Sequence, residues 1–375
     1  MSDKKRKTIG IIGGYGVIGI DVCRWLLQTT PHTIILGGRD KEKGMRAAAG
    51  FDNVRFMAAD VEDPVSLDAF CSECDLVVNC TGPSRILGDG VASVALEKGI
   101  DYVDPSGGES LYNNVYAKHR KKILEKGLCF ILSAGVFPGL SELLPDYIIK
   151  TGFDRVDRVT YHYCAYGDLS WASAWDFVCT LEENVGEGWI CLRDGKKEKE
   201  TQARMVPLPP PVGRIEMIPL LTEGLIRVGG YNNVTTIYEY HSVGKNLLAS
   251  MLSIVGEERY RTADEKRQSA NELIKGADAD LGTMAEALQY CVMIHMEMDG
   301  VLDGNRQKTV TTAYHPSGYP MTAMTVADTA RLVADGAVAG PGLHHFENGV
   351  DQSRFMDLFR KQEGLVYTHS VSGEL

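Results

Sequence analysis

Three glycines near the start of the chain have the spacing of a phosphate-binding turn. Gly14, Gly16 and Gly19 fit the pattern G-x-G-x-x-G and follow an apolar run from Thr8 to Ile12. Such a turn lets the backbone approach a pyrophosphate, whose charge is stabilised by N–H groups at a helix start. We therefore expect a dinucleotide to contact these glycines and the residues between them, Tyr15, Val17 and Ile18. A glycine-rich turn without a ligand is the alternative.

The residues about twenty positions further on indicate which dinucleotide binds. An acidic residue there usually binds the adenosine ribose hydroxyls, whereas an arginine accommodates a 2′-phosphate. Arg39 comes first and Asp40 follows it. Because a guanidinium offers a phosphate paired donors, the sequence favours NADP(H), with both residues at the cofactor site. The alternative is that Arg39 and Asp40 only begin the next helix in solvent.

Two further strand ends carry expected cofactor contacts. Asp60 closes an apolar strand, where a carboxylate can accept from the adenine amino group or cap the following helix. Asn79, Thr81, Gly82 and Pro83 end another strand and should lie between the pyrophosphate and the nicotinamide. A simple turn would also explain Gly82 and Pro83.

The loop Asp104-Pro105-Ser106-Gly107-Gly108-Glu109 is the best candidate for the reaction site. It follows a short expected strand, Tyr102 and Val103. Acids and a hydroxyl at this place can bind a substrate amine or supply a proton to a nitrogen. The predicted catalytic residues are therefore Asp104, Ser106 and Glu109. Asp104 and Ser106 could equally cap the helix that begins near Glu109.

Alternating strands and helices must position these residues. Strands are expected in six places: Thr8–Ile12, His32–Leu36, Val54–Ala59, Asp75–Cys80, Tyr102–Val103 and Cys129–Leu132. Six strands separated by helices predict an α/β fold with a doubly wound parallel sheet. Because parallel strands end at one edge, the glycine turn and the later loops should meet there.

The pattern changes after Thr151. Residues 156–166 alternate as a strand, with Tyr163 and Tyr166 on or near one register, and Trp171 follows in the next segment. These three aromatics are candidates for a substrate pocket, although aromatics at this density often fill a core. We expect a cofactor domain of residues 1–150 plus about 322–375, interrupted by an α+β domain of residues 151–321 for substrate and dimerisation.

Composition limits the partners. The 375 residues carry a net charge of -11, which argues against a nucleic-acid partner. No run of about 18 apolar residues and no signal peptide is evident, so we expect a cytoplasmic protein without a membrane partner. The nine cysteines then stay reduced, and the single C-x-x-C at Cys71 and Cys74 has no second pair. We expect no metal, a small-molecule substrate and a homodimer formed through the second domain.

The chain resembles the saccharopine dehydrogenase-like NAD(P)-dependent oxidoreductases. The matching stretches are Gly13–Gly19, Gly38–Arg39, Asp60, Asn79–Pro83, Gly99–Asp104 and Ala134–Leu140. A weaker match, Gly340–Arg360, resembles the closing loop and helix of the family and contains His344 and His345, where a proton relay or substrate contact is one alternative.

The resemblance implies a Rossmann doubly wound sheet interrupted by a mixed α/β domain. It also implies that the turn Gly135–Gly139 covers the nicotinamide through Val136 and Phe137. The founding chemistry of the family is reduction of a C=N bond, and some members reduce activated C=C bonds instead.

These patterns lead to one hypothesis. We expect an NADPH-dependent reductase that transfers hydride to the imine of a small amino-acid-like or secondary-metabolite substrate. An enoyl reductase and a non-catalytic NADP-binding sensor are the alternatives. The middle of the chain has no paired arginines that would select a dicarboxylate amino acid, so the sequence does not name the substrate.

Overall fold

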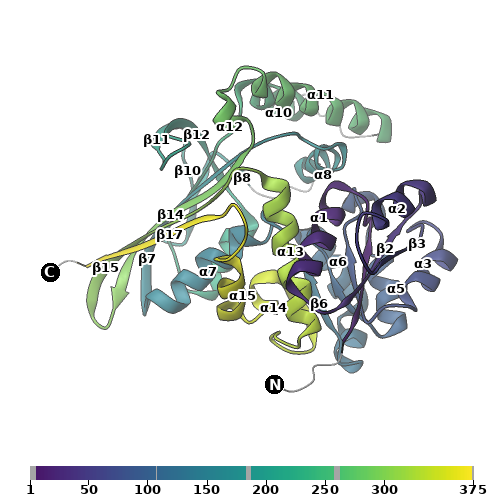
Figure 1. Cartoon of the computed structure of the whole chain (residues 1–375). Coiled ribbons are helices and arrows are strands. Elements are labelled where there is room, and N and C mark those ends of the chain that lie inside the picture. Colours follow the sequence, from purple (N-terminus) through teal and green to yellow (C-terminus); the bar gives the residue numbers. More distant parts are fainter. Residues whose placement is uncertain (1–5, 107, 183–186, 257–261, 374–375) are drawn as a thin grey trace. The chain divides into compact units, whose positions relative to one another are not determined.

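The computed structural model describes residues 6–106, 108–182, 187–256 and 262–373. It divides into two compact units, Met1–Leu143 with Tyr319–Gln362, and Leu144–Gly318 with Glu363–Leu375 (Figure 1). The first unit differs from the expected cofactor domain at its C-terminal end, because Glu363–Leu375 belong to the second unit. Gly107, in the expected reaction loop, lies outside the described residues.

The first unit is built on a parallel sheet of seven strands. Their order is β16-β6-β5-β4-β1-β2-β3, and each neighbouring pair is parallel. This arrangement confirms the predicted fold class. The elements are β1 (Thr8–Ile12), α1 (Val17–Thr29), β2 (Thr33–Gly38), α2 (Lys41–Ala48), β3 (Val54–Ala58), α3 (Pro64–Cys71), β4 (Leu76–Asn79), α4 (Ser84–Leu87), α5 (Gly90–Lys98), β5 (Asp101–Val103), α6 (Gly108–Glu125), β6 (Cys129–Leu132), α13 (Gly318–Ala334), β16 (Gly342–His345), α14 (Phe346–Gly349) and α15 (Gln352–Phe359). Helix α7 (Leu140–Gly152) crosses the boundary between the units.

Helices cover both faces of this sheet, which explains why its central strands are mostly buried and largely apolar. All four residues of β4 and of β6 are buried. Helices α3, α5 and α6 pack on one face, where Leu67, Ala95 and Val115 join a core with Tyr102 and Phe130. Helices α1 and α13 lie on the other side (Figure 1). Burying both faces favours continuous apolar strands over alternating ones.

The seventh strand corrects the sequence-based expectation. Gly342–His345 was expected in a closing loop, but it forms β16 and pairs with β6 in parallel register. The segment contains a glycine and two histidines, so it lacks the apolar run that marks a buried strand. Its position at the sheet edge brings His345 to the carboxyl ends of the strands.

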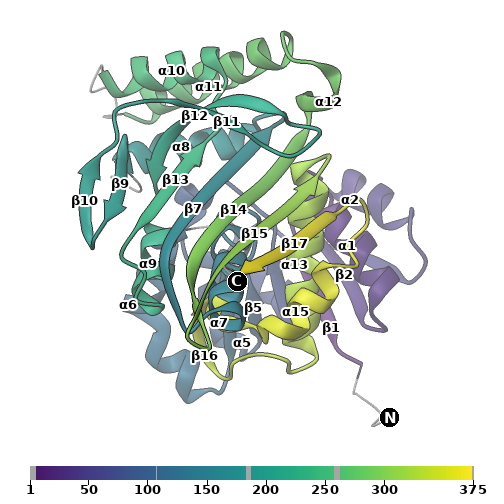
Figure 2. The same ribbon diagram turned by 90° about the vertical axis from the view of Figure 1, so that its left-hand side faces the viewer.

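The second unit contains a mixed, twisted sheet (Figure 2). Its main path is β10-β9-β13-β7-β14-β15-β17, in which β13 and β7 are parallel and β14 pairs antiparallel with β7 and β15. Helices α8, α10 and α11 pack together around Ala174, Ile254 and Leu273. The elements are β7 (Arg155–Tyr166), α8 (Trp171–Glu182), β8 (Glu187–Gly188), β9 (Ile190–Arg193), β10 (Lys196–Lys199), β11 (Arg204–Pro207), β12 (Arg214–Leu221), α9 (Glu223–Tyr231), β13 (Ile237–His241), α10 (Lys245–Gly256), α11 (Ala263–Leu281), α12 (Glu286–Gln289), β14 (Cys291–Leu302), β15 (Asn305–His315) and β17 (Val366–Gly373).

A buried carboxyl group ties the first helix to the returning end of the first unit. Asp328 of α13 accepts hydrogen bonds from the Trp25 indole at 3.0 Å and from the Gln362 amide at 2.8 Å. Burial raises the pKa of Asp328 to about 6, against the effect of these two bonds. The second amide atom of Gln362, Oε1, is buried and has no hydrogen-bond partner among the described residues.

We predict that Asp328→Asn stabilises the protein above pH 6. Because the folded state binds the Asp328 proton more tightly, its unfolding free energy falls by about 3 kcal/mol as pH rises through the range from about 4 to 6. The asparagine side chain carries no charge. If the Gln362 amide flips, the asparagine NH₂ group can donate a hydrogen bond to Oε1 of Gln362, which has no partner in the parent protein among the described residues. The check is the thermal unfolding midpoint of both proteins at pH 4 and pH 7.5. An equal difference between them at both pH values would contradict this account.

Candidate functional site

The glycine turn makes a close contact between backbone segments and leaves a helix start open. Gly13 has φ +75°, and a Cβ there would lie 2.7 Å from the carbonyl oxygen of Cys80. A Cβ on Gly19 would lie 2.8 Å from the Cα of Gly14. Gly16 precedes α1 without a side-chain cap, and α1 has no acidic residue in its first turn. The N–H groups of this helix start are therefore available to an anion such as a pyrophosphate.

Arg39 and Asp40 lie at the end of β2 and play different parts. The Arg39 side chain is 68% exposed, and its guanidinium is 3.7 Å from the equally exposed Glu62. The Asp40 carboxylate accepts from the Lys43 N–H at 3.0 Å and caps α2, which lowers the pKa of Asp40. The alternative that these residues only begin the next helix therefore fits Asp40. Arg39, in contrast, has an exposed guanidinium that can bind a phosphate.

Tyr15 connects the glycine turn to this basic corner. Its hydroxyl oxygen accepts from the Asp40 N–H at 2.8 Å, and its ring occupies the space beside Gly38. Asp60, at the end of β3, accepts from the Glu62 N–H at 3.1 Å. The cap of the next helix is Asp63 and not Asp60, because Asp63 accepts from the N–H of Val65.

A buried polar network joins the ends of β4 and β5. Asp104 is 1% exposed and accepts from the Tyr102 hydroxyl at 2.6 Å, the Asn79 amide at 2.9 Å and the Ser106 N–H at 2.8 Å. Burial and the Asp104 carboxylate raise the pKa of Tyr102 well above its ordinary value, so its hydroxyl keeps its proton and donates. The Asn79 amide also donates a hydrogen bond to the Tyr102 hydroxyl oxygen at 3.1 Å.

This network changes the roles expected of two residues. Asn79 donates to Tyr102 and Asp104 and accepts from the N–H and hydroxyl of Thr81, so its amide is used within the protein. Asp104 likewise has a donor at each carboxylate oxygen. Both residues hold the loops in place. Of the residues that follow β4, Thr81 is half-buried, Gly82 is exposed and Pro83 is buried.

A third loop closes against the other two. The Ala134 N–H donates to the Asp104 carbonyl at 2.9 Å, and a Cβ on Gly135 would lie 2.9 Å from the carbonyl of Pro105. Glu142 is buried and accepts from the Gly139 N–H at 2.6 Å, which fixes the turn before α7. Of the two residues expected to cover the nicotinamide, Val136 is buried and Phe137 is 41% exposed.

Glu109 lies beside a histidine from a distant part of the chain. Its carboxylate is 3.8 Å from Nε2 of His345, and its side chain is 21% exposed. The His345 ring stacks on Tyr112, with 3.6 Å between ring centroids. An acid and an imidazole at the carboxyl edge can together hold and transfer a proton. The sequence indicated both residues separately, but their pairing depends on β16.

Ser133 is a feature that sequence reasoning missed. It follows β6 with φ +59°, an uncommon conformation for a non-glycine residue. It is 2% exposed, and its hydroxyl has no hydrogen-bond partner among the described residues. Such conformations cluster at functional sites, and a dihedral angle leaves no mark in the sequence pattern.

The aromatic candidates of the second unit do not share one face. Tyr163 lies opposite His241 in the register of β7 and β13, and their ring centroids are 5.5 Å apart. Tyr166, three residues later in a regular stretch of β7, points to the opposite face and joins the core around Met217. The expectation that both tyrosines lie on one register is therefore wrong. Trp171 begins α8 and lies 5.2 Å from the ring of Trp175.

Two other expectations concern metals and membranes. Within the described residues, no group of three or more His, Cys, Asp or Glu side chains is arranged to hold a metal ion. Burial raises the pKa of Cys71 and of Cys74 to about 12, so these thiols stay protonated. None of the described helices combines the length and apolar character needed to cross a membrane.

Comparison with known proteins supports the resemblance. Residues 9–131 match the family model described as the saccharopine dehydrogenase NADP binding domain. Saccharopine dehydrogenase (L-Glu forming) from Saccharomyces cerevisiae has the same fold, with a TM-score of 0.69 over 98% of this chain and 100% of that one, at 15% identity. The predicted resemblance and the cofactor NADP(H) are confirmed, and the glycine turn and open helix start described above fit this cofactor.

The curated relatives match only in part. A probable mitochondrial saccharopine dehydrogenase-like oxidoreductase from Arabidopsis thaliana is 35% identical over 33% of this chain and 31% of its own length. A lipid droplet localized protein from Caenorhabditis elegans is 24% identical over 35% of this chain and 33% of its own length. The chain thus spans about a third of these relatives. Their names overturn the expectation of a cytoplasmic location.

We predict that Arg39→Ala weakens the binding of NADPH about 10- to 100-fold and leaves NADH binding unchanged. The reason is the loss of charge-assisted hydrogen bonds to the 2′-phosphate, each worth about 1.5–3 kcal/mol. Fluorescence titration with both nucleotides measures the effect. Arg46→Ala is the control, because Arg46 is an exposed arginine of the neighbouring helix α2. An equal loss for NADPH and NADH would contradict the role of Arg39.

Proposed function

We propose that the protein is an NADPH-dependent reductase that adds hydride to the carbon of an imine. The bound dihydronicotinamide supplies the hydride, and the nitrogen takes a proton, which yields an amine and NADP⁺. The NADP binding domain and the three loops at the carboxyl edge support this proposal. The expected substrate class is a small amino-acid-like or secondary-metabolite imine.

The observation that carries the proposal is the pair of Glu109 and His345. An imine that accepts hydride needs a proton at its nitrogen, and this pair offers one from a partly exposed carboxyl group beside an imidazole. Asp104 cannot move as freely, because three donors hold it. We therefore assign proton transfer to Glu109, assisted by His345, and loop positioning to Asp104. Ser106 lies between Asp104 and Glu109 in the sequence. We assign its hydroxyl to orienting the substrate.

The second unit is assigned substrate binding and dimerisation. Tyr163 and Trp171 remain candidates for substrate contact, whereas Tyr166 is part of a core. Strand β17 supports a homodimer, because among the described residues it pairs only with β15 and seven of its eight residues are exposed. It has no charged residue and no proline between Val366 and Gly373, the features that usually protect an edge strand from pairing.

We predict that NADPH oxidation accompanies reduction of at least one imine, and that Glu109→Gln slows this turnover about 100-fold without changing the Kd for NADPH. The assay uses cyclic imines, amine plus oxo-acid mixtures and enoyl compounds. Glu125→Gln, at the opposite end of the same helix α6, is the matched control.

Two results of this assay would reject the imine proposal. Reduction of enoyl compounds alone would show C=C chemistry, and NADPH binding without turnover of any compound would indicate a sensor. Unchanged turnover in Glu109→Gln would remove Glu109 as the proton donor while leaving the reductase assignment intact.

We predict that the protein sediments as a dimer and that Val371→Lys converts it to a monomer. Val371 is 57% exposed on β17, and a lysine there places like charges together in a self-paired edge. Analytical ultracentrifugation of both proteins is the measurement. Lys308→Ala, on the neighbouring β15, serves as a control away from the free edge. A monomeric parent protein, or a dimeric variant, would refute dimerisation through β17.

A further inference from the structure

Tyr15 joins two parts of the cofactor site. It belongs to the glycine turn and directly precedes Gly16, the N-cap residue of α1. Its hydroxyl oxygen accepts a hydrogen bond of 2.8 Å from the Asp40 N–H, which belongs to the peptide bond between Arg39 and Asp40. One side chain thus connects the turn suited to a pyrophosphate with the strand end that carries Arg39. In a dinucleotide the adenosine ribose lies between these two places.

The Tyr15 ring is held from two sides. Gly38 leaves space for it, because a Cβ on Gly38 would lie 2.8 Å from the ring carbon Cζ. Phe56 of β3 packs near it, with 6.3 Å between the ring centroids and 48° between the ring planes. Together with the bond from Asp40, these contacts fix the Tyr15 hydroxyl beside the backbone of Arg39.

The Tyr15 hydroxyl has a proton left to donate. A phenol hydroxyl can both accept and donate a hydrogen bond. The Tyr15 oxygen accepts from Asp40, but within the described part of the chain its proton goes to no acceptor. The hydroxyl of Tyr102 differs, because it donates to the Asp104 carboxylate at 2.6 Å. The proton of Tyr15 is therefore available to an acceptor that comes from outside the chain.

The charges beside this hydroxyl favour an anion. The ion pair of Arg39 with Glu62, at 3.7 Å, joins side chains that are 68% and 66% exposed, and such pairs contribute little. The Asp40 carboxylate is engaged with α2, where it accepts from the Lys43 N–H and lies 3.6 Å from Lys43 Nζ. A phosphate at this place would meet a guanidinium and a hydroxyl proton, both of which form strong hydrogen bonds to anionic oxygens.

We propose that the Tyr15 hydroxyl donates a hydrogen bond to the 2′-phosphate of NADP(H) and is a specificity-determining residue beside Arg39. NADH carries a neutral hydroxyl in place of this phosphate, so it gains less from the same donor. The inference concerns recognition of the cofactor, so it holds whether or not an imine is the substrate.

Tyr15→Phe tests the proposal, because it removes the hydroxyl and keeps the ring. We expect the Kd for NADPH to rise about 10-fold, the size of one charge-assisted hydrogen bond, and the Kd for NADH to stay unchanged. Fluorescence titration with both nucleotides gives the ratio of the two Kd values. The ratio isolates the 2′-phosphate, the only group by which the two ligands differ. A ratio equal to that of the parent protein would overturn the proposal.

A double-mutant cycle separates direct contact from an effect through Arg39. Tyr15→Phe also removes the acceptor of the Asp40 N–H, and this loss alone can displace the neighbouring Arg39. We therefore expect Tyr15→Phe to raise the ratio again when it is added to Arg39→Ala, because the hydroxyl donates to the phosphate itself. If Tyr15→Phe has no effect in the Arg39→Ala protein, Tyr15 only positions Arg39 and the direct bond is rejected.

Tyr116→Phe is the matched control. It also removes a tyrosine hydroxyl beside an arginine, since Tyr116 of α6 contacts Arg120, whose guanidinium lies 4.5 Å from the ring centroid. Helix α6 carries none of the expected cofactor contacts. We expect both Kd values to keep their parent levels in this variant.

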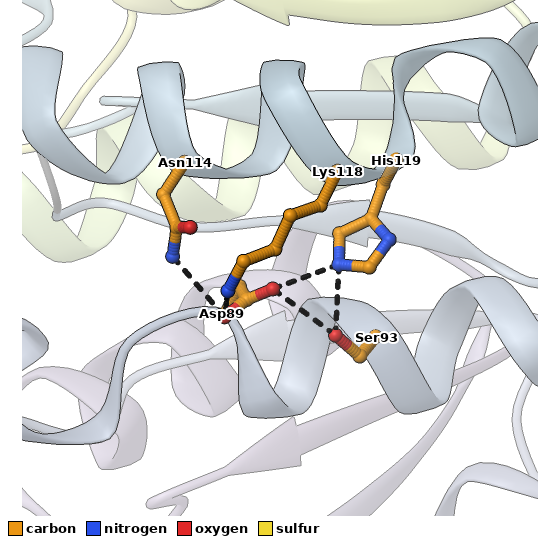
Figure 3. Close-up of polar contacts among 5 residues, drawn as sticks. All are labelled: Asp89, Ser93, Asn114, Lys118 and His119. Carbon is orange, nitrogen blue, oxygen red and sulfur yellow. Dashed lines mark hydrogen bonds and ion pairs between the residues drawn. The ribbon is translucent and has the colours of Figure 1, made fainter.

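Asp89→Ala controls for a loss of stability. The Asp89 carboxylate accepts from Asn114 at 3.1 Å and from Lys118 at 3.0 Å (Figure 3). The His119 ring nitrogen Nε2 lies 2.7 Å from the same carboxylate. These contacts join the start of α5 to α6 and include no residue of α1, β2 or β3. We expect a lower thermal unfolding midpoint with an unchanged ratio, whereas a ratio that rises as in Tyr15→Phe would reject the proposal.

The parent protein separates failure of the premise from failure of the inference. Equal Kd values for NADPH and NADH in the parent would remove the 2′-phosphate site as a whole, and Arg39 with it. A parent that prefers NADPH, together with a Tyr15→Phe variant of the same preference, would reject the role of Tyr15 alone.

Discussion

The carboxyl edge of the first sheet depends on the buried Asp104 carboxylate. A carboxylate removed from water is costly unless donors replace its hydration. Tyr102, Asn79 and the Ser106 N–H supply those donors, and the Asp104 carbonyl accepts from Ala134. The ends of β4, β5 and β6 are therefore fixed to one another by a single residue. Displacement of β4 would remove the Asn79 donor from the buried carboxylate, and displacement of β6 would remove the Ala134 donor from the Asp104 carbonyl.

Close backbone contact is the second constraint on this edge. Gly13 approaches the carbonyl of Cys80, and Gly135 approaches the carbonyl of Pro105. Side chains at either place would separate the glycine turn from β4, or the third loop from the loop that follows β5. Glycine spacing thus sets the distance between loops, while the polar network sets their orientation. Together they make a surface of backbone groups suited to a dinucleotide.

The sequence predicted those strands that short, continuous stretches of apolar residues mark. Continuous apolar runs marked β1, β4 and β6, because both faces of a parallel sheet are buried. It could not predict β16, because this strand pairs with β6 from a distant part of the chain. The pairing of Glu109 with His345 and of Asp89 with α6 joins distant positions, which no local pattern records. Tyr166 was assigned to the wrong face because only strand residues separated by an even number of positions share a face, and Tyr166 follows Tyr163 by three positions.

Stability and function of the first unit have different physical origins. Its helices and strands are held by an apolar core in which Phe70, Tyr102 and Phe130 are almost completely buried. At the carboxyl edge, α4 buries none of its residues. Charge-assisted hydrogen bonds to Asp104 take over there, since they are directional and an apolar contact is not. Directional contacts fix the relative orientation of two loops, which the proposed hydride transfer requires and folding alone does not.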